Sequence, residues 1–133
     1  QYFANKLPSN KNGNIINIID QRVLNLTPHF LTYTISKSAL WTLTQPLALA
    51  LAPNIRVNAI GPGPTIKSKR QTNKKFAEQC EKMPLMRGAD AKEIGNLVKT
   101  ILNTPSMTGQ IIALDGGQHL GWAQSQHNNF NED

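Results

Sequence analysis

Three short apolar runs bounded by turn residues alternate with longer segments of helical periodicity along the chain. The runs occupy residues 14–20, 54–60 and 110–114, and isoleucine dominates them. Short, almost continuous apolar runs of this kind are typical of strands buried on both faces of a parallel sheet. Strands that alternate with helices favour βαβ units with right-handed crossovers, so the pattern predicts an α/β fold.

The longest periodic segment covers residues 31–51 and predicts one long helix with an apolar stripe. Apolar side chains recur at every fourth position there, at Ile35, Ala39, Leu43, Leu47 and Leu51. Pro46 lies inside this segment and is expected to remove one hydrogen bond and bend the helix. Shorter helices are expected over residues 1–7, 74–82 and 91–102, the last after a capping box from Asp90 to Glu93.

The first predicted strand raises a packing problem. It is too apolar to serve as a free sheet edge, because a flat apolar edge invites aggregation. We therefore expect a further strand beside it, from another chain or from a missing N-terminal part of the same protein. Residues 1–122 are expected to belong to one domain, and the polar residues 123–133 to form a disordered tail.

Composition narrows the class of protein only modestly. The chain has 133 residues, which suits a single domain, and its formal net charge is +6. The excess positive charge is concentrated in one segment without aromatic residues for base stacking, so we expect a solvated face or contact with an anionic cofactor, and no nucleic acid. This segment contains Lys67, Lys69, Arg70, Lys74 and Lys75. No apolar stretch is long enough to span a membrane. The single cysteine, Cys80, excludes an internal disulfide and fits a reducing compartment, so a cytoplasmic location is expected.

The candidate chemistry lies at the start of the long helix. Tyr33 and Lys37 are four residues apart, which places a phenol and an ammonium on the same helical face. This spacing alone is common among surface pairs. However, Asp20 ends the first predicted strand, and the carboxyl ends of parallel strands are where α/β sheets build ligand sites.

Five segments in order resemble the C-terminal half of the short-chain dehydrogenase/reductase family. They read NIINIID, YTISKSAL, LALALAPNIRVNAIGPG, MPLMRGADAKEI and TGQIIALDGG, and the similarity covers residues 14–120. The resemblance implies a doubly wound parallel sheet of Rossmann type, of which these strands are the last three and adjacent. It also implies an NAD(P)-dependent oxidoreductase that assembles as a homodimer or homotetramer through the long helix and the last strand.

The resemblance further implies roles for individual residues, without any metal. Tyr33 exchanges a proton with the substrate, and Lys37 stabilises its phenolate and contacts the nicotinamide ribose. Cofactor contacts are expected from Pro62 and Gly63 at the nicotinamide and from Thr65 and Ile66 near the phosphates. The family more often has an apolar residue at the position of Thr65 and a threonine two residues later, where this chain has Lys67.

Asp20 departs from the serine that the family usually has at this position. An ionised carboxylate only accepts hydrogen bonds, so it suits a substrate with N–H donors better than a carbonyl. Pteridine reductases resemble this chain in their Asp–Tyr–Lys arrangement, which implies NADPH-dependent reduction of a pterin or dihydrofolate-like substrate. Two alternatives remain open: a reductase of another carbonyl substrate, and a non-catalytic oligomerising relative in which Asp20 only caps a turn.

The sequence lacks the family's cofactor-binding first half. No glycine-rich fingerprint precedes a helix, and no acidic residue follows at the spacing that reads a ribose. The isolated chain is therefore expected to bind cofactor poorly and to turn over little substrate, and the choice between NAD and NADP stays open. Arg22 and His29, in the loop between Asp20 and Tyr33, are expected to be solvent-exposed at the border of the substrate pocket.

Overall fold

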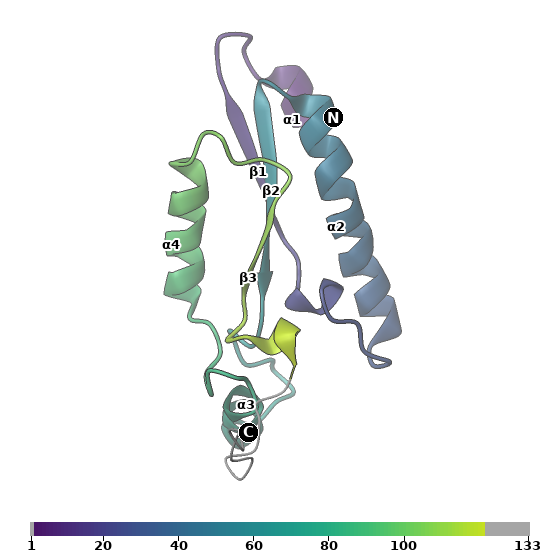
Figure 1. Ribbon diagram of the computed structural model, residues 1–133, viewed down its shortest axis with the longest axis vertical. Helices are drawn as coiled ribbons and strands as arrows, with labels where there is room; N and C mark the ends of the chain where they lie inside the picture. The colour runs from purple at the N-terminus through teal and green to yellow at the C-terminus, as the bar shows by residue number, and fades with distance from the viewer. Residues whose placement is uncertain (1, 122–133) are drawn as a thin grey trace, which may run out of the picture.

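Three parallel strands form a single sheet in the computed structural model, which describes residues 2–121. The strands are β1 (Gly13–Ile18), β2 (Ile55–Pro62) and β3 (Ile111–Leu114), and they lie side by side in the order β1-β2-β3 (Figure 1). The β1–β2 register runs from Gly13 opposite Ile55 to Ile18 opposite Ile60. The predicted α/β class, the parallel pairing and the adjacency of the three strands are confirmed.

Helices cover both faces of this sheet. Figure 1 shows α2 (Leu31–Leu51) and α4 (Ala91–Leu102) on opposite sides of the strands. The remaining helices are α1 (Tyr2–Lys6), α3 (Asn73–Glu81) and the short 3₁₀ turns η1 (Gln21–Val23) and η2 (Gln118–Leu120). These bounds agree with the predicted helices to within two residues, and α2 continues through Pro46. The expected tail, residues 123–133, lies outside the described residues.

The strand ends differ from the prediction in ways that shape the site. β2 continues past Ile60 because Gly61 and Pro62 still pair with β3, where proline's missing N–H leaves its carbonyl available. β1 ends at Ile18 rather than at Asp20, so Asp20 is placed by the turn that follows. β1 is half-buried rather than buried on both faces, because no strand pairs with its outer edge within residues 2–121.

The core lies between α2 and the centre of the sheet. Ala48 of α2 packs against Ile55 and Val57 of β2, and Leu51 and Ile15 close the cluster. β2 is buried along almost its whole length, as expected for the central strand. Burial of its apolar side chains supplies most of the stabilisation, at roughly 1.5–3 kcal/mol for each large side chain.

The apolar stripe of α2 points mainly away from this core. Ile35 is 68% exposed and Leu43 is 53% exposed, whereas the face toward the sheet carries Thr34, Thr44 and Ala48. The buried Thr44 hydroxyl is fully used, because it donates to Leu40 O and accepts from Asn17 Nδ2. Apart from Leu51, which packs in the core, the stripe is therefore left largely uncovered by residues 2–121.

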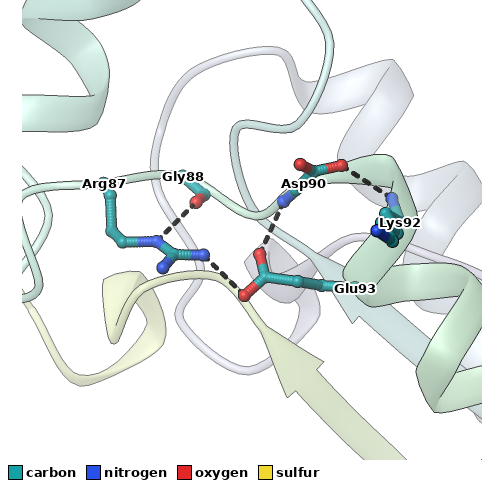
Figure 2. A network of polar contacts seen from close by, with 5 residues as sticks. All are labelled: Arg87, Gly88, Asp90, Lys92 and Glu93. Atoms are coloured by element: carbon teal, nitrogen blue, oxygen red, sulfur yellow. Dashed lines mark hydrogen bonds and ion pairs between the residues drawn. The ribbon is translucent and has the colours of Figure 1, made fainter.

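A network of polar contacts fixes the segment that leads into α4 (Figure 2). Asp90 Oδ1 accepts from Lys92 N at 2.7 Å, and Glu93 Oε2 accepts from Asp90 N at 2.8 Å, which confirms the predicted capping box. Glu93 also pairs with Arg87 Nη2. The hydrogen bond from the Asp90 backbone N–H lowers the pKa of the Glu93 carboxyl below its usual value, and the hydrogen bond from Arg87 adds a smaller effect in the same direction. The capped helix thus anchors residues 83–90 beside the carboxyl edge of the sheet.

Gly88 in this segment touches the turn after β2 and gives a first prediction. A methyl group at Gly88 would lie 1.9 Å from Pro64 O, whereas one at Gly95 meets no atom of residues 2–121 within 4 Å. We expect Gly88→Ala to lower the free energy of unfolding by about 1–3 kcal/mol, because backbone must move to admit the methyl. The control Gly95→Ala should raise it by roughly 0.5–1 kcal/mol through better helix propensity. Urea denaturation measures both, and equal effects would contradict the packing.

Candidate active site

The predicted site residues meet at the carboxyl edge of the sheet. A hollow of about 400 Å³ lies there, between the ends of β1 and β2 and the first turn of α2. We call it the inner hollow. Six of the seven predicted site residues line it: Asp20, Tyr33, Pro62, Gly63, Thr65 and Ile66. The seventh, Lys37, lies one helical turn further along α2 and donates from Nζ to Ile18 O, a residue of the same wall, at 3.1 Å.

Asp20 and Tyr33 form the central contact of the inner hollow. The Tyr33 hydroxyl donates to Asp20 Oδ2 at 2.9 Å, and Asp20 Oδ1 accepts from Arg22 N at 2.8 Å while capping η1. The turn after β1 thus holds the carboxylate, and the start of α2 delivers the phenol to it. A carboxylate has about four acceptor positions, so each oxygen retains one for a further N–H donor.

The hydroxyl of Tyr33 is held in its protonated form. Partial burial, the hydrogen bond to Asp20 and the nearby Asp20 charge raise the pKa of Tyr33 from 10.0 to about 12, against a smaller opposing effect of Arg22. This direction is opposite to the sequence-based expectation that Lys37 would favour the phenolate. The Lys37 ammonium instead donates to Ile18 O and lies 5.7 Å from the centre of the Tyr33 ring.

The raised pKa predicts a pH-dependent contribution of Tyr33 to stability. The folded protein retains the phenol proton at higher pH than the unfolded chain, so this stabilisation is complete below pH 10 and is lost as the pH rises to about 12. Urea denaturation across this range measures the effect. As the pH rises, the unfolding free energy of the wild type should fall relative to that of Tyr33→Phe. A difference that does not change with pH would contradict the Asp20–Tyr33 contact.

The turn after β2 is packed too closely to accept another side chain. A methyl group at Gly63 would lie 2.8 Å from the Cα of Asp115, which follows β3. The Thr65 hydroxyl donates to Gly63 O at 3.0 Å, so its proton is already used within the turn. Gly63 therefore lets the ends of β2 and β3 approach each other beside the inner hollow.

Arg22 is not the solvent-exposed side chain that the sequence suggested. It is half-buried, its Nη1 donates to Thr27 Oγ1 at 2.5 Å and to His29 O at 3.2 Å, and its guanidinium lies 5.4 Å from the centre of the Phe30 ring. Arg22 thereby fixes the loop that connects Asp20 to α2. His29, by contrast, is exposed as expected.

Several wall residues of the inner hollow were not identified from the sequence. Ser68, Gln71 and Gln79 come from α3 and the segment before it, and no motif marks them. Within residues 2–121, no group of histidine, cysteine or acidic side chains is arranged to hold a metal ion. No helix in that range is both long and apolar enough to cross a membrane.

Comparison with known proteins places this geometry in a family. Residues 2–119 match a family model described as enoyl-(acyl carrier protein) reductase. A short-chain dehydrogenase/reductase homolog, YusR of Bacillus subtilis, is 33% identical over 121 residues, which cover 86% of this chain and 89% of that protein. Dihydromonapterin reductase of Citrobacter koseri is 35% identical over 80% of this chain but only 44% of its own length.

Two solved structures are similar to this chain at higher sequence identity than these relatives. FolM alternative dihydrofolate reductase 1 from Brucella suis, crystallised with NADP, is 53% identical with a TM-score of 0.86 and matches 90% of this chain and 49% of its own. The Brucella canis protein, also complexed with NADP, is 51% identical with a TM-score of 0.87 over 93% of this chain and 50% of its own. The chain thus spans about half the length of the FolM proteins and of the dihydromonapterin reductase, but most of the length of YusR. It belongs to the short-chain dehydrogenase/reductase family.

Proposed function

We propose that this chain carries the proton-transfer half of an NADPH-dependent reductase that acts on a pterin or dihydrofolate-like substrate. The observation that supports this most strongly is the hydrogen bond from the Tyr33 hydroxyl to Asp20 Oδ2, at 2.9 Å. It joins a proton donor to a carboxylate in one hollow at the carboxyl edge of the sheet. Relatives named dihydromonapterin reductase and alternative dihydrofolate reductase support the same substrate class.

The chemistry of a dihydropterin suits this pair of side chains. Reduction of its C=N bond adds a hydride to carbon and a proton to nitrogen. Tyr33, whose pKa is about 12, is protonated at neutral pH and can give its proton to the ring nitrogen. Asp20 keeps acceptor positions for the N–H groups of the amino-pyrimidinone ring. The serine usual in the family would instead donate to a carbonyl, so Asp20 favours the pterin over a ketone.

The walls of the inner hollow fit a nicotinamide nucleotide. Ile18 and Ile66 offer apolar surface for the ring, and the Lys37 ammonium, beside the Ile18 carbonyl, suits ribose hydroxyls. The exposed cations that follow Ile66 provide positive charge for phosphates; they are Lys67, Lys69 and Arg70. When bound, NADPH supplies the hydride. The remaining cofactor contacts would come from the part of the relatives' length that this chain does not span.

The exposed stripe of α2 supports assembly with a second copy. Ile35, Leu43 and Leu47 of this stripe present apolar surface that a monomer would leave in water. We therefore propose a homo-oligomer that buries this stripe. The same surface favours, as a second candidate function, a non-catalytic assembly role, in which Asp20 serves only to cap η1.

One assay tests the catalytic proposal. The 133-residue chain is compared with a protein extended to the full length of the FolM relatives. Both are assayed for NADPH oxidation in the presence of a 7,8-dihydropterin. The extended protein should turn over the substrate, and the chain alone should show little or no activity. Absence of activity in the extended protein, with NADPH bound, would favour the assembly role. Full activity of the chain alone would contradict the proposal that cofactor binding needs the part of the relatives' length that this chain does not span.

A further inference from the structure

Asp115, which follows β3, is a buried carboxylate outside the proton-transfer pair. It is only 3% exposed. Its Oδ1 accepts from Gly117 N at 3.0 Å, and its Oδ2 accepts from His119 N at 2.7 Å and from the His119 ring nitrogen Nδ1 at 2.8 Å. A buried carboxylate is unfavourable unless it is hydrogen-bonded, so these contacts hold the side chain in one position. Asp115 thereby fixes the turn that leads from β3 into η2.

The backbone of Asp115 lies directly against the turn after β2. Gly63 N donates to Leu114 O at 3.1 Å, and a methyl group at Gly63 would lie 2.8 Å from both Cα and Cβ of Asp115. Gly63 is a wall residue of the inner hollow, so Asp115 is one contact away from that wall. A turn can be capped at the surface without burying a charge, and capping of η2 alone therefore does not account for the buried position.

The turns after β2 and β3 also meet the segment that leads into α4. A methyl group at Gly116 would lie 2.2 Å from Arg87 O, and one at Gly88 would lie 1.9 Å from Pro64 O. Each of the three loops therefore contacts the other two with no room for a side chain between them. Closely packed backbone transmits a displacement, because no free space absorbs it. The position of the turn after β2 thus depends on how firmly its two neighbours are held.

Each neighbouring loop is held by one charged contact. Figure 2 shows the pair between Arg87 and Glu93 that holds the segment before α4, and both of these side chains are exposed. The turn after β3 is held by Asp115, which is buried. Hydrogen bonds to a charged group are stronger in a buried site than at the surface, where ion pairs contribute little. Asp115 is therefore the stronger support, and its loss should displace the turn after β2 more than loss of the exposed pair.

We propose that Asp115 is a positioning residue for the cofactor. Its carboxylate, together with His119, holds the turn of residues 62–66 in place against the nicotinamide nucleotide. The side chain acts through Gly63 and makes no contact of its own with the ligand. This inference rests on the proposed function, which places the nucleotide in the inner hollow, and it adds a residue that lies behind the wall of that hollow.

Hydrogen exchange in the 133-residue chain tests the support of the turn without any ligand. Asp115→Asn keeps the size of the side chain but replaces one acceptor oxygen with an NH₂ group, so at least one hydrogen bond is lost. The Gly63 amide should then exchange about tenfold faster or more, as expected for loss of one hydrogen bond to a charged group. The Ile94 amide, which donates to Asp90 O in α4, is the control and should not change. An unchanged rate at Gly63, or equal acceleration of both amides, would overturn the proposal.

NADPH binding tests the consequence for the cofactor, in the protein extended to the full length of the FolM relatives. Asp115→Asn should raise the Kd and the KM for NADPH by about threefold to thirtyfold, the usual range of coupling between sites. The kcat and the KM for the dihydropterin, measured at saturating NADPH, should stay nearly unchanged. His119→Asn removes only the ring contact and should raise the Kd less. Glu81→Gln, an equal charge change on an exposed side chain of α3, should have no effect.

The outcomes separate this inference from the proposed function. If the extended wild type binds NADPH but reduces no dihydropterin, the reductase proposal fails, and the change in Kd still decides the role of Asp115. If the wild type reduces the dihydropterin and Asp115→Asn has the same Kd for NADPH but a lower unfolding midpoint, Asp115 serves structure alone and only this inference is overturned. Absence of NADPH binding by the wild type would overturn both.

Discussion

In a protein extended to the full length of the FolM relatives, replacing Tyr33 with phenylalanine should lower kcat for dihydropterin reduction by about 10²–10⁴-fold, the usual contribution of a positioned general acid. The substitution removes only the hydroxyl that donates to Asp20 and keeps the ring that lies near Lys37. The KM should change little, because the lost proton transfer belongs to the transition state. Loss of NADPH absorbance under saturating substrate measures the effect.

The chain contains a matched control for this substitution. Tyr2, the other tyrosine, lies in α1 and is 78% exposed, so Tyr2→Phe should leave kcat unchanged. Retention of more than about a tenth of the wild-type kcat by Tyr33→Phe, well above the range expected for loss of a general acid, would place the proton donor elsewhere. In that case, Asp20 or a bound water would have to supply the proton.

Replacing Asp20 with asparagine should have the second largest effect. The change keeps the shape of the side chain but removes the charge that would accept N–H donors from the pterin, at a cost of about 1.5–3 kcal/mol. This corresponds to a fall in kcat/KM of roughly 10-fold to 200-fold. The pKa of Tyr33 should also fall from about 12 toward 10.0, since two of the three causes that raise it involve Asp20.

Spectroscopic titration of the tyrosines reports that second effect without any substrate. The Tyr33→Phe variant identifies the signal of Tyr2, and the difference from wild type gives the titration of Tyr33. A further variant, Asp20→Ser, restores the donor that is usual in the family and should favour ketones over dihydropterins. A Tyr33 pKa that is unchanged in Asp20→Asn, or an unchanged substrate preference in Asp20→Ser, would argue against the role of this carboxylate.

Much of the fold follows directly from local sequence patterns. The β-branched run before Asp20 and the capping box at Asp90 and Glu93 act over a few residues, so the start of β1 and the beginning of α4 are predictable. The end of β2 is not, because Gly61 and Pro62 remain in the strand only through pairing with β3. The direction of the α2 stripe also depends on tertiary packing, since a periodic pattern does not state which side meets the sheet.

Some features of the candidate site are likewise predictable from the sequence, and others depend on tertiary packing. Spacing along α2 places Tyr33 near Lys37, and the position of Asp20 just after the first strand places it nearby, so the group of residues is predictable. The hydrogen bond of Lys37 to Ile18 O and the raised pKa of Tyr33 are not, because both depend on the distance between elements far apart in sequence. A second hollow, of about 780 Å³, is a further case, since Phe30 and Lys75 line it together only through folding.

The central proposal, that Asp20 and Tyr33 serve a pterin substrate, has one direct test. The protein extended to the full length of the FolM relatives is supplied with NADPH and either a 7,8-dihydropterin or a simple ketone, and kcat/KM is measured for each. A site that is built around an N–H acceptor should prefer the dihydropterin by at least about 10²-fold, because a ketone offers no N–H donor to the remaining acceptor positions of the carboxylate, which repels the carbonyl oxygen. Equal rates, or a preference for the ketone, would contradict the proposal.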